Sequence, residues 1–190
     1  MRDLIEIVRA DLDSYAGYGK RRSFFNAYFL IPGFRVSFWY RLVRWLKSRR
    51  MLRFVAPLAM FMFMHYRHVS GVQLNVGAEI GPGLYIPHFG GIVVNPRARI
   101  GKNCYLSHNV LIGKVHAGPK KGVPRIGDNV FIGTGAALVG DIDIGDNAAI
   151  GINSVVTDDV PSGVFVAGAP AKVVANKTAG EILGVSKDLT

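Results

Sequence analysis

Aliphatic residues return at every sixth position through most of this chain, and this spacing constrains the fold more than any other feature. Side chains of a strand repeat every two residues, so six residues make one short strand and one corner. A period of six therefore predicts a solenoid whose coils are triangular, with each hexapeptide forming one side and its aliphatic anchor pointing inward. The anchors are Leu74, Ile80, Ile86, Ile92, Val94, Ile100, Leu106, Ile112, Ile126, Ile132, Leu138, Ile144, Ile150 and Val156.

Residues that suit tight corners follow many of the anchors. Glycine comes directly after them, and Asn or Asp lies nearby, as in Gly101-Lys102-Asn103 and Gly127-Asp128-Asn129. These residue types tolerate positive φ and form local hydrogen bonds. An ordinary sandwich of two sheets is the alternative, but the regular spacing of consecutive anchors argues against it.

The repeat is interrupted in two places. The register slips by two residues between Ile92 and Val94, directly after Phe89-Gly90-Gly91. Ile112 and Ile126 are 14 residues apart instead of 12, and segment 114–125 between them has no repeat pattern. We expect this segment to be a loop that projects from the solenoid. Irregular segments on a rigid scaffold are common places for functional sites.

The chain divides into a helical region over residues 1–70, a solenoid over 71–174 and a C-terminal tail over 175–190. The single cysteine, Cys104, excludes an intrachain disulfide framework. It falls on an inward position of the repeat, which favours a small core residue over a reactive thiol. The N-terminus shows no signal peptide pattern, so the sequence predicts a cytoplasmic protein.

Most of the net charge lies in the helical region. Residues 1–70 hold 13 Lys and Arg against 4 Asp and Glu, whereas residues 71–190 hold 10 against 9. The apolar segment 54–64, which contains Pro57, has 11 residues, and a membrane-spanning helix needs about 20. Basic residues with Trp and Phe match a helix lying on a membrane surface. Packing of these helices on each other or on neighbouring subunits is the favoured alternative. No nucleic-acid-binding module accompanies the charge, so no nucleic acid is expected.

Several stretches resemble the left-handed β-helix acyltransferases and, more closely, their serine acetyltransferase branch. The resemblance covers residues 9–174 and implies a left-handed parallel β-helix behind an N-terminal α-helical region. It also implies a homotrimer or a dimer of trimers, acetyl-CoA as donor, and active sites in grooves between adjacent prisms. The matching stretches are 9–12 (RADL), 86–94 (IPHFGGIVV), 132–136 (IGTGA), 150–156 (IGINSVV) and 168–174 (GAPAKVV).

Acetyl transfer to a hydroxyl needs a base, a fixed thioester and donors for the developing oxyanion, and it requires no metal. Imidazole suits the role of base because its ordinary pKa lies near working pH. His88 matches the family's catalytic histidine and lies beside the first interruption of the repeat. His116, in the projecting segment, is the second candidate for the base. His108 would either line the same groove as a substrate contact or be a plain surface residue.

The resemblance places coenzyme A along the later coils, held largely by backbone groups. Thr134, Ile152 and Thr157 match positions that contact it in the family. Lys172, and with it Lys177, would meet the coenzyme A phosphates as a point charge or remain solvated.

Four positions depart from the serine acetyltransferase pattern. Pro87 replaces the Asp before the catalytic histidine, and Gln73 replaces a carboxylate that orients it. Gly122-Val123 replaces Arg-His, and residues 17–20 (GYGK) replace Arg-Asp-Pro. A zwitterionic amino acid needs a carboxylate for its ammonium group and a cation for its carboxylate, so these replacements argue against serine. His88 would then be oriented by a backbone carbonyl or by Asn95.

The sequence therefore predicts an acetyl-CoA-dependent O-acetyltransferase acting on a sugar hydroxyl. Its acceptor would be a precursor of a bacterial capsule, exopolysaccharide or lipopolysaccharide. Two alternatives stay open. One is a serine O-acetyltransferase of cysteine biosynthesis with a remodelled pocket. The other is a trimeric scaffold without catalytic activity.

Overall fold

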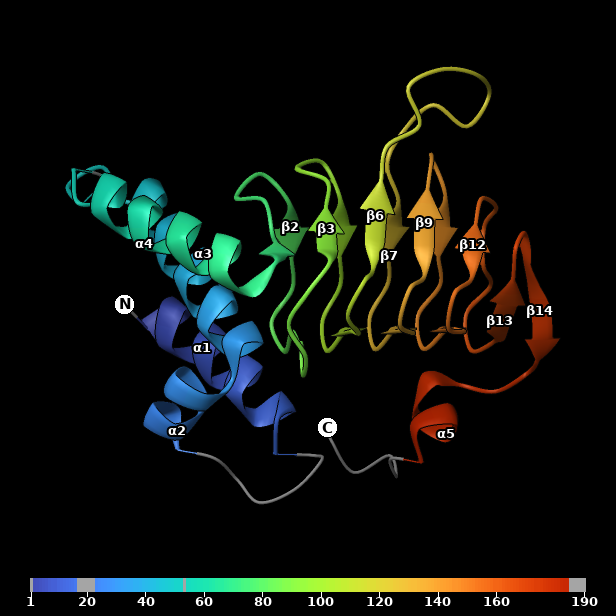
Figure 1. Cartoon of the computed structure of the whole chain (residues 1–190), viewed down its shortest axis with the longest axis horizontal. Helices are drawn as coiled ribbons and strands as arrows, with labels where there is room; N and C mark the ends of the chain where they lie inside the picture. The colour runs from blue at the N-terminus through green and yellow to red at the C-terminus, as the bar shows by residue number, and fades with distance from the viewer. Residues whose placement is uncertain (1, 17–22, 53, 185–190) are drawn as a thin grey trace.

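In the computed structural model, four helices stand at one end of a prism made of short parallel strands (Figure 1). The structure describes residues 2–16, 23–52 and 54–184. The departure from the family pattern noted at residues 17–20 lies outside this range. The helices before the prism are α1 (Arg2–Ser14), α2 (Phe24–Leu30), α3 (Pro32–Ser48) and α4 (Ala56–Ser70), and α5 (Ala179–Leu183) follows it.

The prism has three sheets, which we name A, B and C. Sheet A contains β1 (Val72–Gln73), β3 (Ile92–Val94), β6 (Leu111–Gly113), β9 (Ala137–Val139) and β12 (Val155–Val156). Sheet B contains β2 (Glu79–Ile80), β4 (Arg99–Ile100), β7 (Arg125–Ile126) and β10 (Asp143–Ile144). Sheet C contains β5 (Tyr105–Leu106), β8 (Phe131–Ile132), β11 (Ala149–Ile150), β13 (Phe165–Gly168) and β14 (Ala171–Ala175). All pairings are parallel except that of β13 with β14, which ends the prism as an antiparallel hairpin.

The anchors stack in register from coil to coil, as the period of six predicted. On sheet A, Val94 pairs with Ile112 and Ile112 with Leu138, and all three are fully buried. The predicted role of asparagine at the corners is also confirmed, because asparagines there adopt positive φ between 52° and 60°. The predicted parallel β-helix with an N-terminal helical region is therefore confirmed. The asparagines are Asn103, Asn109, Asn129, Asn147 and Asn153.

The first interruption of the repeat is an insertion in a corner. Val94 pairs with Ile112, yet eight residues separate it from the preceding anchor Ile86, whereas six separate Ile112 from Leu106. The two additional residues therefore lie in the corner 87–91. Ile92 does not begin a new side of the coil but lies on the same strand as Val94.

The second interruption is larger than the sequence analysis inferred. Ile112 and Ile126 lie on consecutive sides of one coil, and such anchors are six residues apart elsewhere, as with Leu138 and Ile144. The insertion is therefore eight residues and not two. Residues 114–124 form a loop that projects from the prism between β6 and β7 (Figure 1). An antiparallel bridge between Val115 and Gly122 narrows its base.

Side chains from the helices close the open end of the prism. The first coil has no coil before it, so its outer backbone groups would lack hydrogen-bond partners. Asp11 of α1 and Arg41 of α3 are 1% and 6% exposed and form an ion pair of 3.0 Å. The Asp11 carboxylate accepts hydrogen bonds from the N–H groups of residues 83 and 84, and the Arg41 guanidinium donates to the carbonyls of residues 80 and 81. The hydroxyl of Tyr40 likewise donates to the carbonyl of Ala78.

The apolar segment around Pro57 is part of a continuous helix. Pro57 lies in the first turn of α4, where the missing N–H would have no partner inside the helix, so it starts α4 and does not break it. No helix in the described part of the chain is both long and apolar enough to cross a membrane.

Candidate active site

One edge of the prism is built from the corners that join sheet C to sheet A. We name it the C–A edge, and it consists of residues 87–91, 107–109, 133–135 and 151–153. Backbone hydrogen bonds join each corner to the next. They run from Asn109 N–H to Gly90 O (3.1 Å), from Gly135 N–H to His108 O (3.1 Å), and from Asn153 N–H to Thr134 O (2.8 Å).

Four of the predicted site residues lie on this edge, one in each successive coil. His88 is exposed, and its ring meets that of His108 edge-to-face with 5.7 Å between centroids. The Nδ1 atom of His108 lies 3.5 Å from the hydroxyl oxygen of Thr134. Ile152 follows in the next coil and is largely exposed. The C–A edge therefore presents two imidazoles, a hydroxyl and an exposed aliphatic side chain in a row.

The two-residue insertion explains why His88 stands out from the prism. Gly90 and Gly91 turn the enlarged corner with φ of 99° and 64°, a region that side chains disfavour. The N–H of Gly90 donates to the carbonyl of Ser70 at 2.8 Å, which ties the corner to the end of α4. His88 and Phe89, which is 67% exposed, lie at its tip.

The hairpin of β13 and β14 continues the C–A edge beyond Ile152. The N–H of Gly168 donates to the hydroxyl of Ser154 at 3.2 Å, so the hairpin packs beside the last of the corners. Lys172 pairs with Ala167 in this hairpin and is exposed. A cation therefore lies at the far end of the edge from His88. Lys177 is also exposed.

Three predicted site residues lie on a different edge, where sheet A turns into sheet B. These are Asn95, His116 in the projecting loop, and Thr157. The carboxamide oxygen of Asn95 accepts a hydrogen bond from the N–H of Arg97, and the whole of β3 separates it from the corner of His88. Among the described residues no hydrogen bond joins Asn95 to His88, so the orienting role of Asn95 stays a prediction.

The positions that carry carboxylates beside the catalytic histidine in the family are neutral here. Pro87 precedes it, and Gln73 is an exposed residue of β1. Within residues 2–16, 23–52 and 54–184, the His88 ring has no ion pair, and its recorded side-chain contact is the His108 ring. Val123 packs against the core, so the position of the family's Arg-His pair supplies no cation here.

Cys104 cannot serve as a nucleophile on this scaffold. It is fully buried, and burial raises the pKa of its thiol to about 12. This agrees with the predicted role of a small core residue. Among the described residues, no group of three or more His, Cys, Asp or Glu side chains could hold a metal ion.

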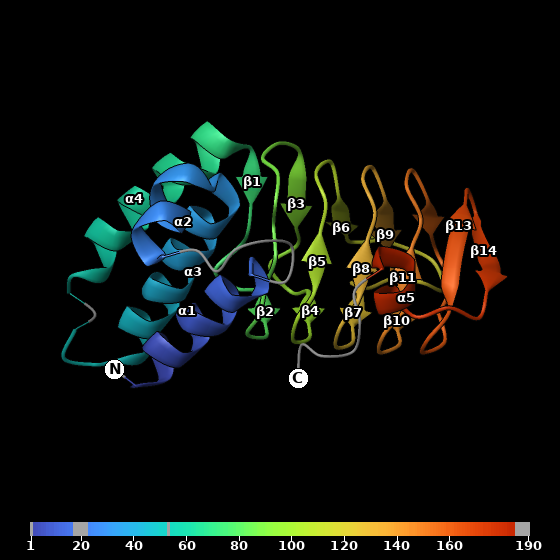
Figure 2. The same cartoon turned by 90° about the horizontal axis from the view of Figure 1, so that it is seen from below.

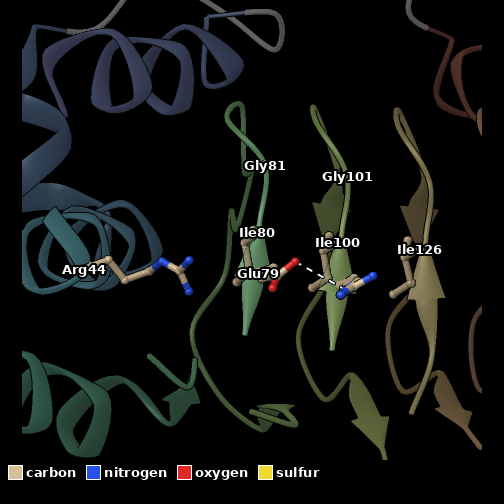
Figure 3. Close-up of a pocket in the computed structure, with 8 residues that line it drawn as sticks. Arg44, Glu79, Ile80, Gly81, Ile100, Gly101 and Ile126 are labelled. Carbon is tan, nitrogen blue, oxygen red and sulfur yellow. Dashed lines mark ion pairs between the residues drawn. The ribbon is translucent and has the colours of Figure 1, made fainter. Parts of the chain in front are cut away.

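Two hollows border the first coils. One of about 200 Å³ lies between α3, α4 and the corner of His88, and Arg35, Tyr66 and Phe89 are among the residues that line it. Sequence reasoning missed this hollow, although the position of Phe89 beside His88 was an available signal. The other, of about 470 Å³, lies along sheet B around the ion pair of Glu79 with Arg99 (Figure 3). Sheet B is the side of the triangle opposite the C–A edge, so this hollow does not belong to the site of His88.

Comparison with known proteins places this scaffold among serine acetyltransferases. No family model matches the chain. A serine acetyltransferase of Helicobacter pylori is 33% identical over 145 residues, which are 76% of this chain and 82% of the relative. One of Synechococcus elongatus is 35% identical over 144 residues, which are 75% of this chain but 57% of the relative.

A solved structure supports the same assignment. Serine acetyltransferase of Brucella abortus in complex with coenzyme A superposes with a TM-score of 0.78 at 26% identity, covering 91% of this chain and 68% of that one. Likeness on this scale supports the left-handed coil that the resemblance implied. The chain belongs to the serine acetyltransferase family of hexapeptide-repeat transferases.

Proposed function

We propose that this protein transfers an acetyl group from acetyl-CoA to a hydroxyl group, with His88 as the general base. The observation that carries the proposal is the placement of His88. It is exposed on the one corner that carries a two-residue insertion, at the start of an edge that also bears His108 and Thr134.

The base that the reaction needs is of the kind found on this edge. The acceptor oxygen attacks the thioester carbonyl carbon while an imidazole nitrogen of His88 takes the hydroxyl proton. The C–S bond then breaks, and the same proton is available to the departing thiolate. His108, which touches the His88 ring, is positioned to contact the acceptor.

Coenzyme A would lie along the C–A edge beyond His108. Thr134 and Ile152 occupy the next two corners, and the relative from Brucella abortus was solved with coenzyme A bound. Lys172, at the end of the edge, would meet a phosphate of the coenzyme as a point charge. Because acetyl-CoA is a cytoplasmic metabolite, we place the activity in the cytoplasm.

We propose that the site is completed by a neighbouring subunit in a trimer of prisms packed side by side. Within one chain, His116, Asn95 and Thr157 lie on the edge between sheets A and B. A neighbouring prism that turns this edge toward the C–A edge would bring them to His88 and Thr134. His116 would then act in the site of the adjacent subunit.

L-Serine is the first candidate acceptor. The curated relatives compared above are named serine acetyltransferases, and none of them supports the sugar acceptor that the sequence analysis favoured. Their names therefore support the serine O-acetyltransferase alternative better than the sugar O-acetyltransferase.

A sugar hydroxyl of a bacterial surface glycan is the second candidate. The observation that favours it is the loss of two carboxylates beside His88, where Pro87 and Gln73 stand in their place. An ammonium group brought into this site would lose water without gaining a charged partner from these positions. A neutral sugar hydroxyl has no such requirement.

The test is acetyl-CoA consumption by the purified protein, measured with L-serine, simple sugars, nucleotide sugars and lipid-linked oligosaccharides. We expect acceptor-dependent release of free thiol with one of these classes. Turnover of L-serine at an ordinary enzymatic rate would reject the glycan candidate, and turnover of a sugar alone would reject serine. Failure to bind acetyl-CoA would overturn the proposed reaction and support the scaffold alternative.

A further inference from the structure

We propose that the outward face of α4 and the turn before it dock this protein on an anionic lipid bilayer. We name this surface the α4 face. It contains Met51, Leu52, Phe54, Val55, Leu58, Phe61 and Met64, all of them exposed.

One side of α4 packs on α3, and the other side exposes large apolar residues, as expected of a helix that also binds a partner. Its inner side packs small or fully buried residues against α3, with Ala59 at 5% exposure and the Phe63 ring against that of Tyr40. On its outer side and in the preceding turn, Phe54, Leu58 and Phe61 are 75%, 69% and 69% exposed. Large apolar side chains gathered this way on a soluble surface mark an interaction site.

Exposed basic residues border the α4 face. Between Ser14 and Ala78 the sequence contains 11 Lys and Arg and no Asp or Glu. Lys47 and Arg50 are exposed directly before the apolar residues, and Arg49 between them pairs with Asp3. An apolar helix face bordered by exposed cations is the pattern of a helix that lies in the interface of an anionic membrane.

Charge also decides between a bilayer and a second copy of the chain. Two copies meeting through their α4 faces would bring two strongly basic regions together, and like charges across an interface oppose association. An anionic bilayer offers the complementary sign along with an apolar interior. The helix has 15 residues and is too short to span a bilayer, so it would lie in the plane of the surface.

The position of the helices suits this arrangement. They occupy the end of the prism opposite β14 (Figure 1), and turning the molecule by 90° leaves α4 at that end (Figure 2). In the trimer of prisms proposed above, three α4 faces would lie at the same end. Simultaneous contacts would then reinforce each other.

The experiment is flotation of the full-length protein with vesicles of equal parts phosphatidylglycerol and phosphatidylcholine, compared with vesicles of pure phosphatidylcholine. We expect flotation with the anionic vesicles at low salt and weaker flotation as salt screens the cations. The variant Leu58→Gln/Phe61→Gln should lower the partition coefficient by about 100-fold, because inserting each side chain contributes about tenfold or more. Lys47→Gln/Arg50→Gln should also lower the partition coefficient, because it removes two cations and leaves the apolar residues in place.

Two matched double variants, placed away from the α4 face, control for the general effect of replacing two apolar or two basic residues. Val173→Gln/Val174→Gln removes two exposed apolar residues at the other end of the prism, and Lys102→Gln/Lys177→Gln removes two exposed cations of the prism and tail. Neither should change flotation. Far-UV circular dichroism and gel filtration of each variant report folding and oligomeric mass.

The proposal is overturned if wild-type protein stays at the bottom of the gradient with anionic vesicles at low salt. It is also overturned if the Leu58→Gln/Phe61→Gln variant floats as the wild type does. A fall in oligomeric mass for that variant, without a change in flotation, would assign the α4 face to contacts between copies of the chain instead.

Discussion

Replacing Asp11 with Ala should destabilise the junction between the helices and the prism. The carboxylate is 1% exposed and holds the buried guanidinium of Arg41. It also accepts hydrogen bonds of 2.9 Å from the N–H groups of Gly83 and Leu84. Removing it leaves a buried cation and two backbone donors without their partner. Breaking a buried pair in this way costs about 3–5 kcal/mol of unfolding free energy.

The assay is urea unfolding followed by tryptophan fluorescence, since Trp39 and Trp45 both lie in α3. A loss of about 4 kcal/mol lowers the urea midpoint by about 1–4 M, because m is about 1–3 kcal/mol per M of urea for small proteins. Asp3→Ala is the matched control, because Asp3 lies on the same helix and pairs with Arg49 on the surface, where a pair contributes about 1 kcal/mol or less. All variants are compared at one protein concentration, because association of subunits shifts the apparent stability. Equal losses for Asp11→Ala and Asp3→Ala would refute the reasoning.

Three further predictions concern packing, reactivity and coenzyme binding. Gly33→Ala should cost about 1–3 kcal/mol in the same unfolding assay, because a Cβ there would lie 2.1 Å from the carbonyl oxygen of Ile86; unchanged stability would contradict this contact. Cys104 should resist a thiol-specific disulfide reagent at pH 8 in the folded protein and react after unfolding, because burial raises its pKa to about 12; fast labelling of the native protein would contradict its burial. Lys172→Ala should raise the KM for acetyl-CoA by about threefold to tenfold with little change in kcat, whereas Lys102→Ala should leave both unchanged; equal effects of the two would remove Lys172 from the coenzyme site.

The sequence predicts the parts of the fold that repeat. The anchors fix three sheets and their register, because one aliphatic residue per side must face inward in every coil. The asparagines predict the corners because their side chains tolerate positive φ. The pairing of Asp11 with Arg41 cannot be predicted in this way. The two residues are 30 positions apart on two different helices, and no repeat in the sequence relates them. It becomes visible only when the helices lie on the open end of the first coil.

The candidate site was predictable to a similar degree. His88, His108, Thr134 and Ile152 occupy equivalent corners of successive coils, so their grouping follows from the period once each corner is assigned to an edge. Asn95 lies beyond β3 from His88, so its orienting role stays a prediction. The acceptor could not be read from these residues. The neutral positions beside His88 argue for a sugar hydroxyl, whereas the relatives that share this fold are named for serine.

The most direct test of the central claim is the rate of acetyl transfer by His88→Ala compared with His116→Ala, measured as thiol release with the acceptor found in the screen. If His88 is the base, its loss should lower kcat by about 10²–10⁴-fold with the KM for acetyl-CoA nearly unchanged. His116→Ala should keep a far larger share of the activity. Transfer that persists unchanged in His88→Ala, or that disappears only in His116→Ala, would contradict the assignment of the base to the C–A edge.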